Sequence, residues 1–221
     1  NDDIALALCM VHMRFLQARD SFHPLLAVYV DALPAVGSMG QPMFWDAAEI
    51  EELEGSNYAD RAIALRPQAQ AAHDALIASF GGETATGTFE QFLWGLAMVR
   101  SRMFWIGPSN FPTIVDKEGA AMVPFIDYAN HDPRLPACTS HLRESADGSS
   151  FELVALADCP EGVAILTSYG RKPGADLLMG WGFVPAGNPY DAIELELTLD
   201  RATMAEPDRV RLSLVAAAGP P

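Results

Sequence analysis

Basic side chains and long apolar runs are both scarce in this sequence. The 221 residues carry 14 Lys and Arg side chains against 29 Asp and Glu, which gives a formal net charge of −15. Because nucleic-acid binding depends on cations that neutralise phosphates, this balance argues against DNA or RNA as a partner. The longest apolar run, Ile4 to Val11, has eight residues, far short of the roughly 20 that span a bilayer. We therefore expect no nucleic-acid partner and no membrane span.

Cysteines and common catalytic motifs are also few. Cys9, Cys138 and Cys159 are too scattered for a disulfide framework, which favours a reducing compartment. Gly180-Trp181-Gly182 lacks the third glycine of a dinucleotide-binding loop, and no serine lies in a Gly-x-Ser-x-Gly frame. These absences argue against nucleotide-binding and serine-hydrolase functions.

One group of residues has the right types for a zinc site. His131, Cys138, His141 and Cys159 fall within one region of the chain. Their gaps of seven, three and eighteen residues match no regular zinc spacing. The alternative interpretation is a solvent-facing loop histidine with two packed thiols, and we expect no metal site.

The first hundred residues carry helical patterns and the remainder carries short strands, which predicts an α+β fold. Thr88-Phe89-Glu90-Gln91 fits a capping box that starts a helix running to about Phe104 and buried on most sides. Apolar spacing predicts further helices over 4–19, 25–33, 47–53, 58–79 (interrupted at Pro67) and 175–179 (closed by Gly180). Strands are expected over 122–126, 151–156, 163–167 and 193–199, with 151–167 forming a hairpin.

Two strand ends carry polar residues that secondary structure alone does not require. The apolar run 122–126 leads directly into Asp127-Tyr128-Ala129-Asn130-His131, and Leu166-Thr167-Ser168 leads into Tyr169 just before Gly170. Such places at the edge of a core often hold ligands. The structural alternatives are an Asx-turn at the first place and a core tyrosine with one hydrogen bond at the second.

In their order along the chain, these segments resemble the SET-domain protein lysine methyltransferases of the Rubisco large-subunit type. The resemblance rests on the helix 92–102, on the two polar strand ends and on Trp181-Gly182-Phe183-Val184. Upstream, the segments 29–34 and 44–53 resemble the helical insert that this family places inside its SET domain. The resemblance implies three parts of an α+β chain. They are a helical insert over 1–105, the C-terminal half of a SET-domain β fold over 106–189, and the start of a truncated substrate-binding domain over 190–221.

The family resemblance implies methyl transfer from S-adenosylmethionine to a lysine side chain of a protein such as the Rubisco large subunit. It further implies a monomer and leaves open whether the compartment is the chloroplast or the cytoplasm. Two alternatives stay open: a non-catalytic SET-like protein-binding module, and a methyltransferase directed at histidine.

Site residues follow from the same resemblance. Tyr169 matches the active-site tyrosine whose hydroxyl faces the transferred methyl. Arg102, on the buried helix, can pair with the carboxylate of the cofactor, the alternative being a pair with a structural carboxylate. The residues implied for the cofactor are Arg102, Asp127, Asn130 and His131. The residues implied for the lysine channel, with core packing as their alternative, are Phe104, Trp181 and Phe183.

Two departures from the family pattern motivate the non-catalytic alternative. The family's glycine-rich cofactor segment precedes the helical insert, and we expect it to be absent because this chain begins inside that insert. Gly174 stands where the family often has asparagine, which removes a possible local hydrogen bond.

Overall fold

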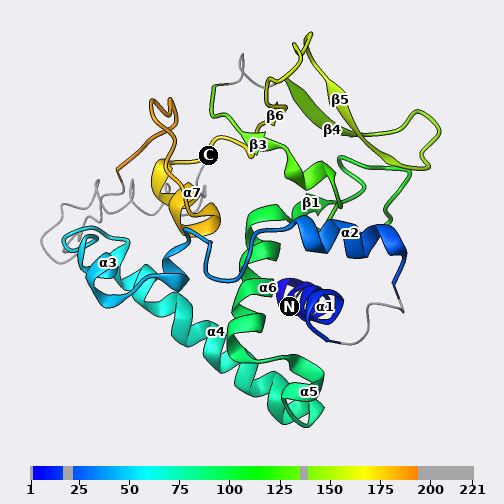
Figure 1. Ribbon diagram of the computed structural model, residues 1–221. Coiled ribbons are helices and arrows are strands. Elements are labelled where there is room, and N and C mark those ends of the chain that lie inside the picture. Colours follow the sequence, from blue (N-terminus) through cyan, green and yellow to red (C-terminus); the bar gives the residue numbers. More distant parts are fainter. Residues whose placement is uncertain (1, 17–21, 135–138, 194–221) are drawn as a thin grey trace, which may run out of the picture.

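Helices occupy the first hundred residues of the computed structural model and short strands follow them (Figure 1), so the α+β prediction is confirmed. The structure describes residues 2–16, 22–134 and 139–193. The helices before the first strand are α1 (Asp2–Arg14), α2 (Pro24–Ala32), η2 (Pro42–Phe44), α3 (Ala47–Glu51), α4 (Ala59–Phe80), α5 (Glu83–Thr86) and α6 (Phe89–Arg102). The later elements are β1 (Phe104–Ile106), β2 (Gly119–Ala121), η3 (Ile126–Tyr128), β3 (Asn130–His131), β4 (Ser140–Glu144), β5 (Phe151–Ala155), β6 (Leu166–Thr167) and α7 (Gly174–Trp181).

Helix α6 runs through the middle of the helical part, with α1 and α4 packed on it (Figure 1). The predicted capping box is present, because Thr88 and Gln91 each accept a hydrogen bond from the other's backbone N–H. Every residue from Phe92 to Val99 is buried, which confirms a helix enclosed on most sides. The core around it also contains Ala7, Met10, Tyr29, Val30, Leu33, Met43 and Ala69.

Pro67 does not interrupt α4, contrary to the sequence expectation. A proline inside a helix removes one amide donor and leaves the carbonyl four residues earlier without its partner. Pro67 and Ile63 are both exposed, so water can bind the carbonyl of Ile63. The helix continues to Phe80 and ends at Gly81, whose φ of 83° is the left-handed conformation expected of a C-terminal glycine.

The segment 122–126 forms no strand, so the strand predicted there is wrong. Pro124 and Phe125 form a turn that leads into η3, and the Asp127 amide donates to the Val123 carbonyl across it at 3.2 Å. Phe125 has a φ of 69°, rare for a residue with a side chain. The turn therefore presents Asp127 within η3 instead of at a strand end.

The strands pair differently from the predicted hairpin over 151–167. β5 pairs antiparallel with β4, in a register that joins Ser140 to Ala155 and Glu144 to Phe151. This hairpin turns at Asp147-Gly148, a strong local turn signal, and Gly148 has a positive φ of 67°. β6 instead pairs in parallel with β3, which brings the two polar strand ends side by side.

The last predicted elements differ in their bounds. α7 extends to Trp181 and ends at Gly182, with φ 82°, so Gly180 lies inside the helix. The strand predicted over 193–199 lies, apart from Ile193, outside the described residues. Among the helices that the structure describes, none combines the length and apolar character that a membrane crossing needs.

We expect Gly95→Ala to destabilise the protein, because α1 and α6 meet closely at this residue. A Cβ at Gly95 would lie 2.6 Å from the Ala7 carbonyl oxygen. Overpacking of about 1–3 kcal/mol outweighs the helix-propensity gain of about 1 kcal/mol. Chemical denaturation measures the loss. Gly180→Ala in α7 is the matched control, since nothing lies within 4 Å of its Cβ position. Equal effects of the two substitutions would contradict the close-packing explanation.

Candidate active site

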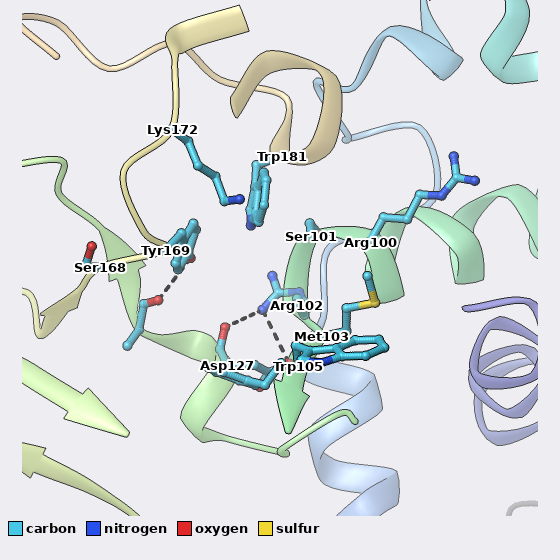
Figure 2. Close-up of a pocket in the computed structure, with 12 residues that line it drawn as sticks. Arg100, Ser101, Arg102, Met103, Trp105, Asp127, Ser168, Tyr169, Lys172 and Trp181 are labelled. Carbon is cyan, nitrogen blue, oxygen red and sulfur yellow. Dashed lines mark hydrogen bonds and ion pairs between the residues drawn. The ribbon is translucent and has the colours of Figure 1, made fainter. Parts of the chain in front are cut away.

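Segments far apart in the sequence converge on two neighbouring pockets at the end of α6, and Figure 2 shows residues that line the larger of the two. The larger, about 330 Å³, is lined by Phe104 and Trp105, and we name it the β1 pocket. The smaller, about 220 Å³, is lined by Gly40, and we name it the Gly40 pocket. The residues common to both pockets are Ser101, Arg102, Asp127, Tyr169 and Trp181.

The Gly40 pocket exists because two glycines let the helical part touch the end of α7. A Cβ on Gly40 would lie 2.3 Å from the Gly182 carbonyl oxygen, and a Cβ on Gly182 would lie 2.5 Å from the Gly40 carbonyl carbon. Only glycine permits this backbone approach. Next to it, the buried side chain of Gln41 donates to the carbonyls of Ala97 and Gly180, each at 3.4 Å, and so joins α6 to α7.

Asp127 is a buried carboxylate held from two sides. The Tyr29 hydroxyl, on α2, donates to Asp127 Oδ2 at 2.5 Å. Arg102 Nη1 lies 3.9 Å from the same oxygen and donates to the Asp127 carbonyl at 3.1 Å. Burial raises the pKa of Asp127 above its usual range, although the Tyr29 hydrogen bond and the Arg102 charge oppose the rise. The alternative role of Arg102, an ion pair with a structural carboxylate, therefore occurs with Asp127 at 3.9 Å.

Aromatic contacts hold the turn that carries Asp127. Tyr128 stacks on Tyr29, with ring centroids 5.5 Å apart, and its hydroxyl donates to the Tyr29 carbonyl at 2.7 Å. Phe125, the residue with positive φ, meets the edge of Tyr29 at 5.6 Å. A strained backbone conformation persists only where its surroundings determine it. Tyr29 therefore stabilises both the turn and the carboxylate.

Three aromatic rings form a column beside the pockets. His131 stacks on Tyr169 at 4.9 Å between centroids, and Tyr169 stacks on Trp181 at 5.5 Å. The Tyr169 hydroxyl donates to the Ala129 carbonyl at 3.0 Å (Figure 2), and burial raises the pKa of Tyr169. His131 Nδ1 accepts from the Tyr169 amide at 3.1 Å, which places the proton of the neutral ring on Nε2. Burial lowers the pKa of His131, so this neutral form prevails at pH 7.

The structure brings most of the predicted site residues together. Those that line at least one pocket are Arg102, Phe104, Asp127, Asn130, Tyr169, Trp181 and Phe183. His131 lines neither pocket and lies against Tyr169 instead. Sequence reasoning missed Ser101, Lys172 and Tyr29. The first two are neighbours of predicted residues, whereas Tyr29 lies 98 positions before Asp127 and carried no sign of their contact.

Polar atoms without partners show what a bound group would satisfy. Among the buried polar atoms without a hydrogen-bond partner in the described part of the chain, Arg102 Nε and Asp127 Oδ1 belong to residues that line both pockets. Such atoms are uncommon in native proteins and often mark a ligand site. The Arg102 atom is a donor and the Asp127 atom is an acceptor, which fits a ligand that carries both a carboxylate and an amine. S-adenosylmethionine carries both groups, so the residues present fit this cofactor.

A metal fits the site less well. No cluster of three or more potential ligands occurs among the His, Cys, Asp and Glu side chains that the structure describes. Of the zinc candidates, Cys138 lies outside the described residues. Cys159 and His141 are both exposed, so the alternative of a packed thiol is wrong for Cys159.

The curated relatives of the chain are lysine methyltransferases, whereas no protein-family model matches it. The chain is 29% identical over 112 residues to ribosomal lysine N-methyltransferase set10 of Schizosaccharomyces pombe, which covers 51% of this chain and 20% of that protein. It is 22% identical over 186 residues to the chloroplastic Rubisco large subunit N-methyltransferase of Nicotiana tabacum, covering 79% and 36%. The chain thus spans less than half the length of these relatives.

Solved structures show the same likeness in three dimensions. Rubisco LSMT bound to AdoMet matches with a TM-score of 0.69 at 18% identity, over 98% of this chain and 47% of that chain. The SET domain of LSMT bound to lysine and AdoHcy matches with a TM-score of 0.70 at 16% identity, over 99% and 48%. The chain has the fold of the LSMT SET domain, and the resemblance seen in the sequence is confirmed.

We expect Tyr29→Phe to destabilise the protein by about 1–3 kcal/mol at pH 7, because the buried Asp127 carboxylate loses its donor. The lost hydrogen bond had lowered the pKa of Asp127, so that pKa rises further. A carboxyl whose folded-state pKa exceeds the unfolded value, about 3.9, loses stability as the pH rises through the folded pKa. The cost should therefore be smaller at an acid pH below the raised pKa of Asp127, where the carboxyl is protonated, and denaturation at that pH and at pH 7 measures the difference.

Tyr128→Phe is the matched control for this prediction. It also removes one phenol hydrogen bond, but its acceptor is a carbonyl that does not titrate. Its cost should be the same at both pH values. A pH-independent cost for Tyr29→Phe would mean that Asp127 does not depend on this donor.

Proposed function

We propose that this chain forms the cofactor and lysine sites of a protein-lysine N-methyltransferase that uses S-adenosylmethionine. The observation that carries the proposal is the convergence of Arg102, Asp127, Tyr169 and Trp181 on the boundary of two neighbouring pockets. A transfer reaction needs such an arrangement, because donor and acceptor must meet from two directions at one place. When bound, S-adenosylmethionine supplies a methyl group activated by its sulfonium.

The Gly40 pocket is the proposed cofactor side of the site. Asn130 lines it, and so does Phe183, which the sequence had assigned to the lysine channel but which does not line the β1 pocket. Arg102 at the end of α6 and Asp127 in η3 line it with their unpartnered Nε and Oδ1 atoms. The guanidinium suits the cofactor's carboxylate, and the carboxylate of Asp127 suits its amine. His131 supports this side indirectly by fixing the Tyr169 backbone.

The β1 pocket is the proposed lysine channel. Phe104, Trp105 and Trp181 give it an aromatic wall, and Tyr169 stands where it meets the Gly40 pocket. Apolar and aromatic walls favour a neutral amine over a hydrated ammonium. The channel would therefore hold the extended lysine side chain and direct its nitrogen toward Tyr169.

Catalysis in this proposal comes from alignment. Tyr169 is held rigidly by stacking on both faces and by its hydrogen bond to the Ala129 carbonyl. Because burial raises its pKa, the phenol stays protonated and acts as a dipole and a wall. Methyl transfer needs the nitrogen, the methyl carbon and the departing sulfur in line, which such a fixed wall promotes.

The domain division is part of the proposal: a helical insert over 1–105, the C-terminal half of a SET domain over 106–189, and the start of a substrate-binding domain over 190–221. A monomer agrees with a site built from one chain. Three relatives are named ribosomal lysine N-methyltransferases and one is named for the Rubisco large subunit. We therefore propose a lysine of a ribosomal protein or of Rubisco as the target.

Gly174 was one of the two departures from the family pattern that motivated the non-catalytic alternative, and its contacts do not support that alternative. The Gly174 amide donates to Asp191 Oδ1 at 2.9 Å, so this carboxylate holds the start of α7. A Cβ on Gly174 would lie 3.1 Å from both Asp191 Oδ1 and Val184 Cγ1, which leaves little room for asparagine. Glycine is therefore compatible with an ordered site.

A labelling experiment tests the proposed function. The full-length protein is incubated with methyl-tritiated S-adenosylmethionine and either purified ribosomes or Rubisco, and labelled proteins are identified by mass spectrometry. We expect label on a lysine, whereas label on histidine would favour the histidine-directed alternative. No label on either material, together with no cofactor binding by calorimetry, would support a non-catalytic module and end the enzymatic proposal.

Two substitutions should separate binding from catalysis. We expect Arg102→Met to weaken cofactor binding about 10- to 100-fold, the value of a charge-assisted hydrogen bond. Tyr169→Phe should leave cofactor affinity within about threefold and lower kcat at least tenfold, because it removes only the hydroxyl. Calorimetry and steady-state kinetics give the two quantities. Arg143→Met is the matched control, since Arg143 pairs with Glu152 on the β4–β5 hairpin. The reverse pattern would exchange the two assigned roles.

A further inference from the structure

Lysine is rare in this chain, and one of its two lysines lies in the site. The sequence contains Lys117 and Lys172 against twelve arginines. Lys117 is exposed on the segment before β2. Lys172, between β6 and α7, lines the β1 pocket, which the proposed function assigns to the acceptor lysine.

The geometry directs the Lys172 ammonium at the aromatic wall of that pocket. Its Nζ lies 5.3 Å from the centre of the Trp181 ring (Figure 2), the ring that continues the column formed with Tyr169 and His131. The Lys172 carbonyl accepts a hydrogen bond from Asn188 at 2.9 Å, which fixes its backbone. The backbone from which the Lys172 side chain reaches Trp181 is therefore held in place.

The charges that face Lys172 do not neutralise it. Within residues 2–16, 22–134 and 139–193, no carboxylate forms an ion pair with Lys172. Asp127 is the carboxylate that lines the pocket, and it already contacts Tyr29 and Arg102. The other charged or titratable groups on the pocket are Arg100, Arg102 and Tyr169, with His131 behind Tyr169. Arg100 pairs with Asp3 at 3.8 Å, which leaves Arg102 and Lys172 against Asp127. The pocket therefore carries an excess of positive charge in a chain of net charge −15.

A cationic pocket is unexpected for a substrate side chain that is itself cationic in water. Only the neutral amine has the lone pair that attacks a methyl carbon, so the proton must leave before transfer. A like charge nearby disfavours the protonated form of an amine. The charge of Lys172 already acts within the site, since it adds to burial in lowering the pKa of His131.

We propose that the Lys172 ammonium repels a protonated acceptor amine in the β1 pocket, so that the acceptor is held there in its neutral, reactive form. This inference rests on the proposed function. Lys172 is a specificity-determining residue: it takes no proton and forms no bond to the substrate, and the proton of the amine leaves to solvent before the amine enters.

The test is the pH dependence of kcat in the full-length protein, with the protein labelled above as acceptor, because kcat reports ionisations in the enzyme–substrate complex. Lys172→Met should move the acid limb of the profile up by about 0.5–1 pH unit, the size of a like-charge interaction through partly solvated space. At pH values well below the midpoint of the acid limb, this shift lowers the rate about three- to tenfold. Lys172→Arg keeps the charge and should keep the profile. Lys117→Met, which removes the other lysine, should also leave it unchanged.

A second readout does not depend on turnover. A peptide with a ¹³Cε-labelled lysine is bound in the presence of S-adenosylhomocysteine, and the pKa of its amine is followed by NMR. We expect a higher amine pKa with Lys172→Met than with wild type, and a smaller difference at high salt. The same pKa in both proteins would overturn the inference.

The outcomes separate the inference from the function on which it rests. Labelled substrate with an unchanged pH profile in Lys172→Met overturns the role of Lys172 alone. Higher activity of Lys172→Met at every pH would show that Lys172 competes with the acceptor for Trp181, which also overturns it. Absence of both labelling and cofactor binding removes the proposed function and the inference together.

Discussion

The hydrogen bond from Tyr29 to Asp127 is the interaction on which the site most depends. It joins the helical part of the chain to η3 across 98 residues. It also supplies the hydrogen-bond donor that a buried carboxylate needs. A buried charge without a partner is among the most costly features in a folded protein. The stacking of Tyr29 on Tyr128 and its contact with Phe125 use the same side chain to hold the turn. The position of Asp127 and the packing of α2 are thus one energetic unit.

Arg102 and the two glycines extend this unit to the rest of the site. Arg102 ends α6, the most buried helix, and donates to the Asp127 backbone, so the core sets the position of the turn. Gly40 and Gly182 bring the loop before η2 against the end of α7 and close the Gly40 pocket. Each contact joins a residue of the helical part to one of the strand part. The pockets therefore exist only when both parts are folded.

Local signals predicted the elements whose cause is local. The capping box of α6 is present as predicted, and α3 and α4 begin and end within two residues of their predicted bounds, because such signals lie within one turn. The predictions that were wrong concern segments whose conformation depends on contacts with residues distant in the sequence. The run 122–126 has the composition of a strand. Pro124 and the contact of Phe125 with Tyr29 of α2 instead make the chain turn there, and η3 follows. β6 has two residues, so its pairing with β3 follows from the fold and not from its own sequence.

The sequence by itself determined the α+β composition, the family resemblance and most of the residues that line the pockets, because those features depend on residue type and order along the chain. Only the tertiary structure decided which residues support them. Tyr29 holding Asp127, His131 lying behind Tyr169, and Lys172 facing Trp181 are all contacts between separate elements. Their free energies come from burial and distance, and neither quantity can be read from spacing along a chain.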